Sequence, residues 1–199
     1  MASGFLIVME GVDGSGKSTQ VELLAASLEK DGHEVVLTRE PTSGPAGQRL
    51  QSYLLGPSRH LSPAEELHLF MEDRREHVAQ IIKPSLERGK IVITDRYYYS
   101  TVAYQGALGL DPGEILAANE VFAPRPDLVL LLLMPVAQAL ARLQRARQVS
   151  ELAPYLERVA AIYDNLPGAH IQRVDAMATP QTLHANLLAR ILEALKDMG

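Results

Sequence analysis

The chain has 199 residues, of which 47% are hydrophobic and 22% charged, with a net charge of −5 at pH 7 and no cysteine. This composition excludes disulfide scaffolds, thiolate metal sites and cysteine nucleophiles, and it argues against general binding of nucleic acids or membrane surfaces. No run approaches the roughly 18 apolar residues of a membrane span, and the N-terminus lacks the features of a signal peptide. We therefore expect one cytoplasmic domain over residues 1–199, with no nucleic-acid or membrane partner.

The N-terminal segment predicts a strand, a loop and a helix. The apolar run Phe5–Met9 predicts the strand, and residues 18–29 predict a helix with one apolar face. Between them stands Gly-Val-Asp-Gly-Ser-Gly-Lys-Ser, a complete phosphate loop, whose backbone N–H groups and helix N-terminus favour phosphate. Lys17 is expected to reach the β- and γ-phosphates of ATP, and Ser18 to bind Mg²⁺. The predicted nucleotide-binding residues are Gly11, Asp13, Gly14, Ser15, Gly16, Lys17, Ser18 and Thr19.

Further apolar runs alternate with helical segments along the chain. They predict four more strands, at residues 34–38, 91–94, 128–134 and 170–174. Capping residues followed by proline at Ser62 and Asp111 mark two helix starts. The fold class is therefore α/β, a P-loop NTPase-like parallel five-stranded sheet flanked by helices on both faces.

In such a sheet, ligands bind at the carboxyl ends of the strands, where this chain carries charged residues. Asp95 is placed as a Walker-B-type aspartate that holds Mg²⁺, and Arg96 as a partner for a second phosphate. The alternative is an ion pair between these two side chains. Arg39 follows another strand on the same edge, and its alternative is a solvated surface arginine.

Three other groups of residues leave two interpretations open. Phe70 and Arg74 lie four apart on one helix, which fits a base clamp or ordinary core packing beside a surface ion pair. Tyr97–Ser100, together with Tyr104 and Gln105, could contact a sugar and base or pack against a helix. Residues 142–147 carry three arginines, which fits a solvated helix end or a lid over a transferring phosphoryl group. The absence of arginine at positions 13–16 favours the lid.

These motifs together resemble those of the bacterial thymidylate kinases. The resemblance rests on residues 11–19, Thr38-Arg39-Glu40-Pro41, Asp95-Arg96-Tyr97 and Ala103-Tyr104-Gln105-Gly106. It implies transfer of the γ-phosphoryl group of ATP to dTMP, giving dTDP and ADP in nucleotide biosynthesis, with Mg²⁺ and as a homodimer. The alternatives are a P-loop kinase for another deoxynucleotide such as dUMP, and a non-catalytic ATP-binding switch.

By this likeness Lys17, Arg39, Arg96 and Arg145 are the catalytic residues. Arg39 and Arg96 would hold the acceptor phosphate, Asp13 would approach it and the deoxyribose, and Ser18 and Asp95 would hold the metal. The glycine at position 14 resembles the family type whose arginine lies in a lid, here near residues 142–153. That segment departs from the usual Asp-Arg-x-Glu-like pattern, since Gln148–Pro154 stands in its place.

The likeness also assigns a pocket for the nucleoside. Phe70 would stack on thymine and Arg74 would hydrogen-bond it. Tyr104 would crowd the 2′ position and so disfavour ribonucleotides, while Ser100 and Gln105 would line the base pocket.

Overall fold

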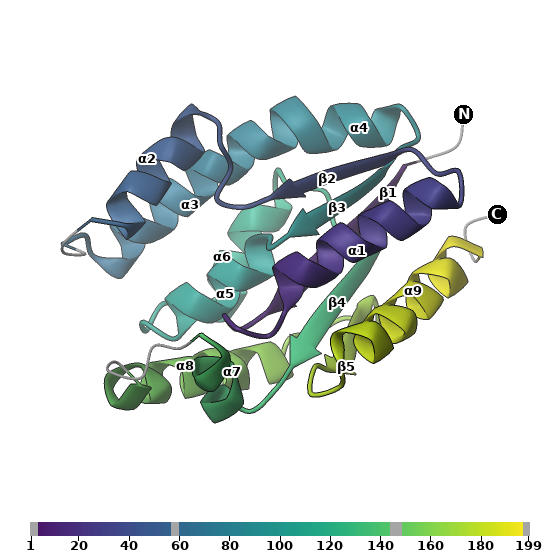
Figure 1. The fold of residues 1–199 in the computed structure, drawn as a ribbon. Helices are drawn as coiled ribbons and strands as arrows, with labels where there is room; N and C mark the ends of the chain where they lie inside the picture. The colour runs from purple at the N-terminus through teal and green to yellow at the C-terminus, as the bar shows by residue number, and fades with distance from the viewer. Residues whose placement is uncertain (1–3, 57–59, 144–148, 197–199) are drawn as a thin grey trace.

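The structure is a computed structural model that describes residues 4–56, 60–143 and 149–196. All five strands of its sheet run parallel, as the sequence predicted, and their order is β2-β3-β1-β4-β5 (Figure 1). The strands are β1 (Phe5–Gly11), β2 (Val35–Arg39), β3 (Ile91–Asp95), β4 (Leu128–Leu133) and β5 (Ile171–Asp175). Each begins or ends within one or two residues of its predicted bounds, as expected for strand ends.

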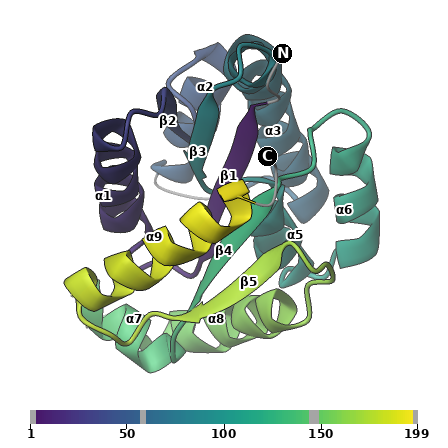
Figure 2. The same ribbon diagram turned by 90° about the vertical axis from the view of Figure 1, so that its right-hand side faces the viewer.

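Helices connect the strands and cover both faces of the sheet, as Figures 1 and 2 show. They are α1 (Lys17–Lys30), α2 (Pro45–Leu54), α3 (Pro63–His77), the π-helix η1 (Val78–Ile82), α4 (Lys83–Glu87), α5 (Tyr98–Gly106), α6 (Pro112–Glu120), α7 (Val136–Arg142), α8 (Val149–Asp164) and α9 (Pro180–Lys196). Among the described residues, no helix has the length and apolar character needed to cross a membrane.

The central strand β1 is buried on both faces and divides the core in two. Leu6 and Val8 pack in the cluster that includes residues of η1, α5 and α8. Ile7 and Met9 point the other way and pack against α1 and α9. Successive side chains of a strand face opposite sides, so one apolar strand supplies both halves of the core.

The two predicted helix starts are confirmed. The Ser62 side chain accepts a hydrogen bond from the backbone of Glu65, and the Glu65 carboxylate accepts one from the Ser62 N–H, which completes a capping box. The Asp111 side chain accepts from the N–H groups of Gly113 and Glu114. Helix α3 continues through η1 into α4, and the π-helical turn comes just before Pro84, because proline has no N–H to donate to the preceding turn.

Parallel pairing brings the functional strand ends to one rim. Arg39 at the end of β2 lies in register with Asp95 at the end of β3, and Met9 of β1 is also paired with Asp95. The phosphate loop leaves β1 at Gly11, on the same rim. The rim therefore carries the phosphate loop and both charged strand ends, as the sequence predicted.

Candidate active site

The phosphate loop is held tightly against α7. Gly14 has φ of 86°, in the left-handed region, and a Cβ built there would collide with the carbonyl oxygen of Ala139. Any larger side chain would meet the same carbonyl. This packing gives a physical reason for the lack of an arginine at position 14.

Lys17 is folded over the phosphate loop. Its side chain is only 5% exposed, and Nζ donates to the carbonyl oxygen of Val12 at 3.0 Å. Burial, with the positive charge of Arg96 nearby, lowers the pKa of Lys17 to about 8. Among the described residues this ammonium group has one hydrogen-bond partner, so a bound anion would stabilise its charge.

Ser18 and Asp95 come together although 77 residues separate them in sequence. Ser18 Oγ donates to Asp95 Oδ2 at 2.6 Å, while the buried Oδ1 of Asp95 has no hydrogen-bond partner among the described residues. A hydroxyl beside a carboxylate with a free oxygen is a donor set that suits Mg²⁺. The described residues contain no group of three or more His, Asp or Glu that could hold a metal alone.

Arg96 lies just beyond β3 with an unusual backbone. Its φ of 74° is the one positive value at a non-glycine among the described residues, and its N–H donates to the carbonyl oxygen of Met9 at 3.0 Å. The guanidinium pairs with Asp13 at 2.6 Å and donates to Ser100 Oγ at 2.8 Å. The alternative pairing with Asp95 is therefore wrong. A costly left-handed arginine so close to the phosphate loop indicates a functional position.

Glu10 is linked to Arg96 through the hydroxyl of Ser100 and was missed in the sequence analysis. It is fully buried in β1 and accepts hydrogen bonds from the backbone N–H groups of Tyr97 and Ser100 and from the hydroxyls of Ser100 and Tyr163. Burial raises the pKa of Glu10, and the nearby Arg96 opposes that shift. A charged residue at the end of an apolar strand, directly before the phosphate loop, is the signal that could have identified it.

Three cavities meet at Arg96. One, of about 360 Å³, lies along the phosphate loop and is lined by Lys17, Ser18 and Arg142 among others. A second, of about 340 Å³, lies between the ends of β2 and β3 and is lined by Arg39 and Asp95. A third, of about 150 Å³, lies between α3 and α5. Each of the three includes Arg96 in its wall.

The third cavity collects most of the predicted nucleoside-binding residues. It has Arg96 at one end and a half-buried Phe70 in its wall, with Tyr155 of α8 beside them. The Arg96 guanidinium lies over the Tyr104 ring, 5.2 Å from its centre. The other predicted residues that line it are Asp13, Ser100, Tyr104 and Gln105.

Arg74 occupies a different place from the one that its spacing with Phe70 suggested. Its side chain is 1% exposed and is not in the wall of the cavity. The guanidinium donates to Glu40 Oε2 at 2.6 and 3.0 Å, to Thr101 Oγ1 at 2.8 Å and to Asn119 Oδ1 at 2.7 Å. Four of its five N–H donors are thus used within the protein. The alternative of a surface ion pair is therefore wrong, because the pair with Glu40 is buried, whereas the contact of Arg74 with the base stays a prediction.

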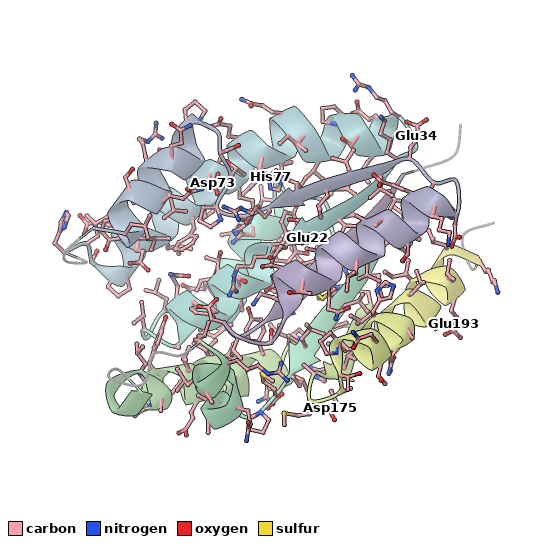
Figure 3. The ribbon with its side chains drawn as sticks, in the orientation of Figure 1. Glu22, Glu34, Asp73, His77, Asp175 and Glu193 are labelled. Atoms are coloured by element: carbon pink, nitrogen blue, oxygen red, sulfur yellow. The ribbon has the colours of Figure 1, made fainter. Side chains whose placement is uncertain are left out.

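A buried polar network surrounds this arginine, and Figure 3 shows two of its members on α3, Asp73 and His77. His77 bridges Glu40 Oε1 at 3.0 Å and Thr38 Oγ1 at 2.8 Å. Burial alone would raise the pKa of Glu40, but Arg74 and His77 together hold it below its usual value. Asp73 accepts from the backbone and hydroxyl of Thr42. The network fixes the turn after β2, the strand that ends at Arg39.

Two other predicted groups have definite outcomes. Tyr97, Tyr98 and Tyr99 are buried in the core, as the packing alternative predicts, whereas Ser100, Tyr104 and Gln105 line the third cavity. Arg145 and most of the arginine-rich segment lie outside the described residues. Arg142 is described, and it donates to the carbonyl oxygen of Ala176 at 3.2 Å while lining the cavity beside the phosphate loop.

Comparisons with known proteins agree with this geometry. A family model described as thymidylate kinase matches residues 9–187. The chain is 43% identical over 197 residues to the thymidylate kinase of Desulfotalea psychrophila, which covers 97% of this chain and 96% of that protein. It is 48% identical over 201 residues to that of Xanthomonas campestris pv. campestris, which covers 98% and 86% of the two chains. The chain therefore belongs to the thymidylate kinase family, the ATP-dependent kinases that convert dTMP to dTDP.

Proposed function

We propose that this chain transfers the γ-phosphoryl group of ATP to dTMP at the point where the three cavities meet. The observation that carries the proposal is the shared position of Arg96, which borders the phosphate-loop cavity and the cavity that contains Phe70. A donor nucleotide in the first and an acceptor in the second would bring their phosphates to the same guanidinium. Binding both substrates in this way supplies the positioning on which phosphoryl transfer depends.

On the donor side, the N–H groups of the phosphate loop and Lys17 would bind the ATP phosphates. Ser18 and Asp95 would hold Mg²⁺, because their oxygens adjoin and one carboxylate oxygen has no hydrogen-bond partner among the described residues. The ion would neutralise phosphate charge. Arg145, in the lid near residues 142–153, is our proposal for a further positive charge on the transferring group.

On the acceptor side, Arg39 and Arg96 would hold the phosphate of dTMP. Their shared cavity also contains Asp95 and Ser18, so the acceptor would face the donor phosphates directly. The acceptor oxygen is already anionic, so the reaction needs charge neutralisation more than a general base. Phe70 would stack on the base, and Tyr104 would crowd the 2′ position of the sugar.

The remaining assignments rest on the family likeness. Asp13 would approach the deoxyribose, although it is paired with Arg96 in this structure. Arg74 would offer the base at most the one N–H donor that has no acceptor among the described residues. We propose that the single domain works as a homodimer in the cytoplasm.

The test is ADP formation from ATP and Mg²⁺ with dTMP, dUMP, dCMP or thymidine supplied separately. We expect a clear preference for dTMP, and we expect Arg96→Ala to lower kcat/KM for dTMP roughly 100- to 1000-fold through loss of a preorganised phosphate contact. Arg49→Ala is the matched control, since Arg49 is 61% exposed and pairs with Glu72 on the surface. Preference for another acceptor would overturn the base assignment, and ATP binding without acceptor-dependent ADP would favour the switch.

A further inference from the structure

The side-chain amide of Gln105 has one end bound and the other free. Gln105 lines the cavity that contains Phe70 and is itself 1% exposed. Its Nε2 donates to Glu66 Oε1 at 3.0 Å. Its Oε1 is buried and has no hydrogen-bond partner among the described residues. Buried polar atoms are normally paired, so an unpaired acceptor in a cavity wall points to a donor on a ligand.

Glu66 determines which way that amide faces. It lies on α3 one turn before Phe70, is 4% exposed and lines the same cavity. Its other carboxylate oxygen, Oε2, accepts from the Tyr53 hydroxyl at 3.1 Å. An ionised carboxylate only accepts hydrogen bonds, so it can face only the NH₂ end of an amide. A flipped Gln105 would set two oxygens against each other, and its carbonyl must therefore point away from Glu66.

We propose that Glu66 is a specificity-determining positioning residue, which fixes the Gln105 amide so that its carbonyl accepts the N3–H of thymine. The inference rests on the proposed position of the dTMP base beside Phe70. Thymine joined to deoxyribose has a single hydrogen-bond donor on its ring, the N3–H. Cytosine has a lone pair at N3 instead, which the fixed carbonyl oxygen repels. The pair thus selects for a pyrimidine whose N3 carries a hydrogen.

The test compares kcat/KM for dTMP with kcat/KM for 5-methyl-dCMP, since these nucleotides differ only at positions 3 and 4 of the base. In Glu66→Gln the new amide can offer Gln105 either its oxygen or its NH₂ group, so the Gln105 carbonyl is no longer fixed. We expect the preference for dTMP to fall roughly three- to tenfold, the value of about one hydrogen bond, with the KM for ATP unchanged. Glu72→Gln is the matched control on α3, since Glu72 contacts Arg49 and His68 on the surface.

A second variant, Gln105→Leu, distinguishes positioning of the Gln105 amide from a general disturbance of the pocket. In Gln105→Leu the acceptor is gone, so adding Glu66→Gln should leave the remaining preference unchanged. If Glu66→Gln does not fold, Tyr53→Phe loosens the same carboxylate without a change of charge and should lower the preference in the same direction. A preference in Glu66→Gln equal to that of Glu72→Gln would overturn the proposal, as would additive effects in the double variant.

Binding measurements keep this inference separate from the proposed reaction. Isothermal titration gives the ratio of Kd values for dTMP and 5-methyl-dCMP without any chemistry. A wild-type protein that bound dTMP but formed no ADP would refute the proposed function. The Kd ratio in Glu66→Gln would then still decide whether Glu66 sets the preference: a fall supports the proposal, and an unchanged ratio overturns it.

Discussion

Replacing Glu10 with alanine should lower the free energy of unfolding by about 2–6 kcal/mol. Two of the hydrogen bonds that Glu10 accepts come from backbone N–H groups, that of Tyr97 at 2.9 Å and that of Ser100 at 3.0 Å. Both donors would stay buried after the side chain is removed, and each unpaired buried donor costs about 1–3 kcal/mol. Two such donors give the stated range.

Glu10→Gln should cost much less, about 1 kcal/mol. The amide oxygen can still accept from both N–H groups, and the hydroxyls of Ser100 and Tyr163, at 2.6 and 2.9 Å, can rotate to accept from its NH₂. The comparison also depends on pH. Because burial raises the pKa of Glu10 above 4.5, the folded protein holds this proton more tightly than the unfolded chain. The stability that this bound proton contributes is fully present below pH 4.5 and is lost as the pH rises through the folded pKa. Glu10→Gln therefore gains stability relative to wild type over this pH range.

Urea denaturation followed by circular dichroism measures the free energy of unfolding of both variants. Equal slopes of this free energy against urea concentration would show that the same surface is exposed on unfolding. A loss below about 1 kcal/mol for Glu10→Ala would refute the count of unpaired donors. Equal losses for the alanine and glutamine variants would refute the rotating hydroxyls. A stability difference between Glu10→Gln and wild type that stays constant from acid to neutral pH would contradict the raised pKa.

Two further predictions concern the phosphate loop. In a pH–rate profile, the kcat/KM for ATP should fall as the pH rises through about 8, because burial and Arg96 lower the pKa of Lys17 to that value. The neutral amine no longer offsets phosphate charge. A flat profile to pH 9.5 would contradict this. Gly14→Ala should lower the free energy of unfolding by about 1–3 kcal/mol more than Gly32→Ala, as measured by thermal or urea unfolding. Both glycines have positive φ, but of the two only Gly32 has open space for a Cβ. Equal losses would refute the collision with Ala139.

The sheet and its binding rim were predictable because the signals for them are local. Apolar runs gave the five strands, and the phosphate-loop motif fixed where the donor nucleotide is expected to bind. Parallel strands carry their functional residues at one end, so Asp95 could be placed near Ser18 without knowledge of the packing. In each case short segments with strong periodicity or a rare motif carried the information.

The surroundings of the charged side chains were not predictable in the same way. The four-residue spacing of Phe70 and Arg74 gave a common helix face, but Arg74 pairs with Glu40, Thr101 and Asn119, which follow β2 or belong to α5 and α6. Such partners depend on how whole elements pack, which no local pattern encodes. The unpaired carbonyl of Gln105 was hidden for the same reason, since its direction depends on a residue 39 positions away.

The position of Asn119 has a consequence for reading mutant libraries. This side chain is fully buried on α6, outside all three cavities, yet it donates to the carbonyl oxygen of Ile115 and accepts from Arg74. A genetic screen for loss of nucleotide turnover would therefore score Asn119 alongside true contact residues. Loss of turnover in such a screen would thus report damage to the buried hydrogen-bond network of Arg74 as well as loss of substrate contacts.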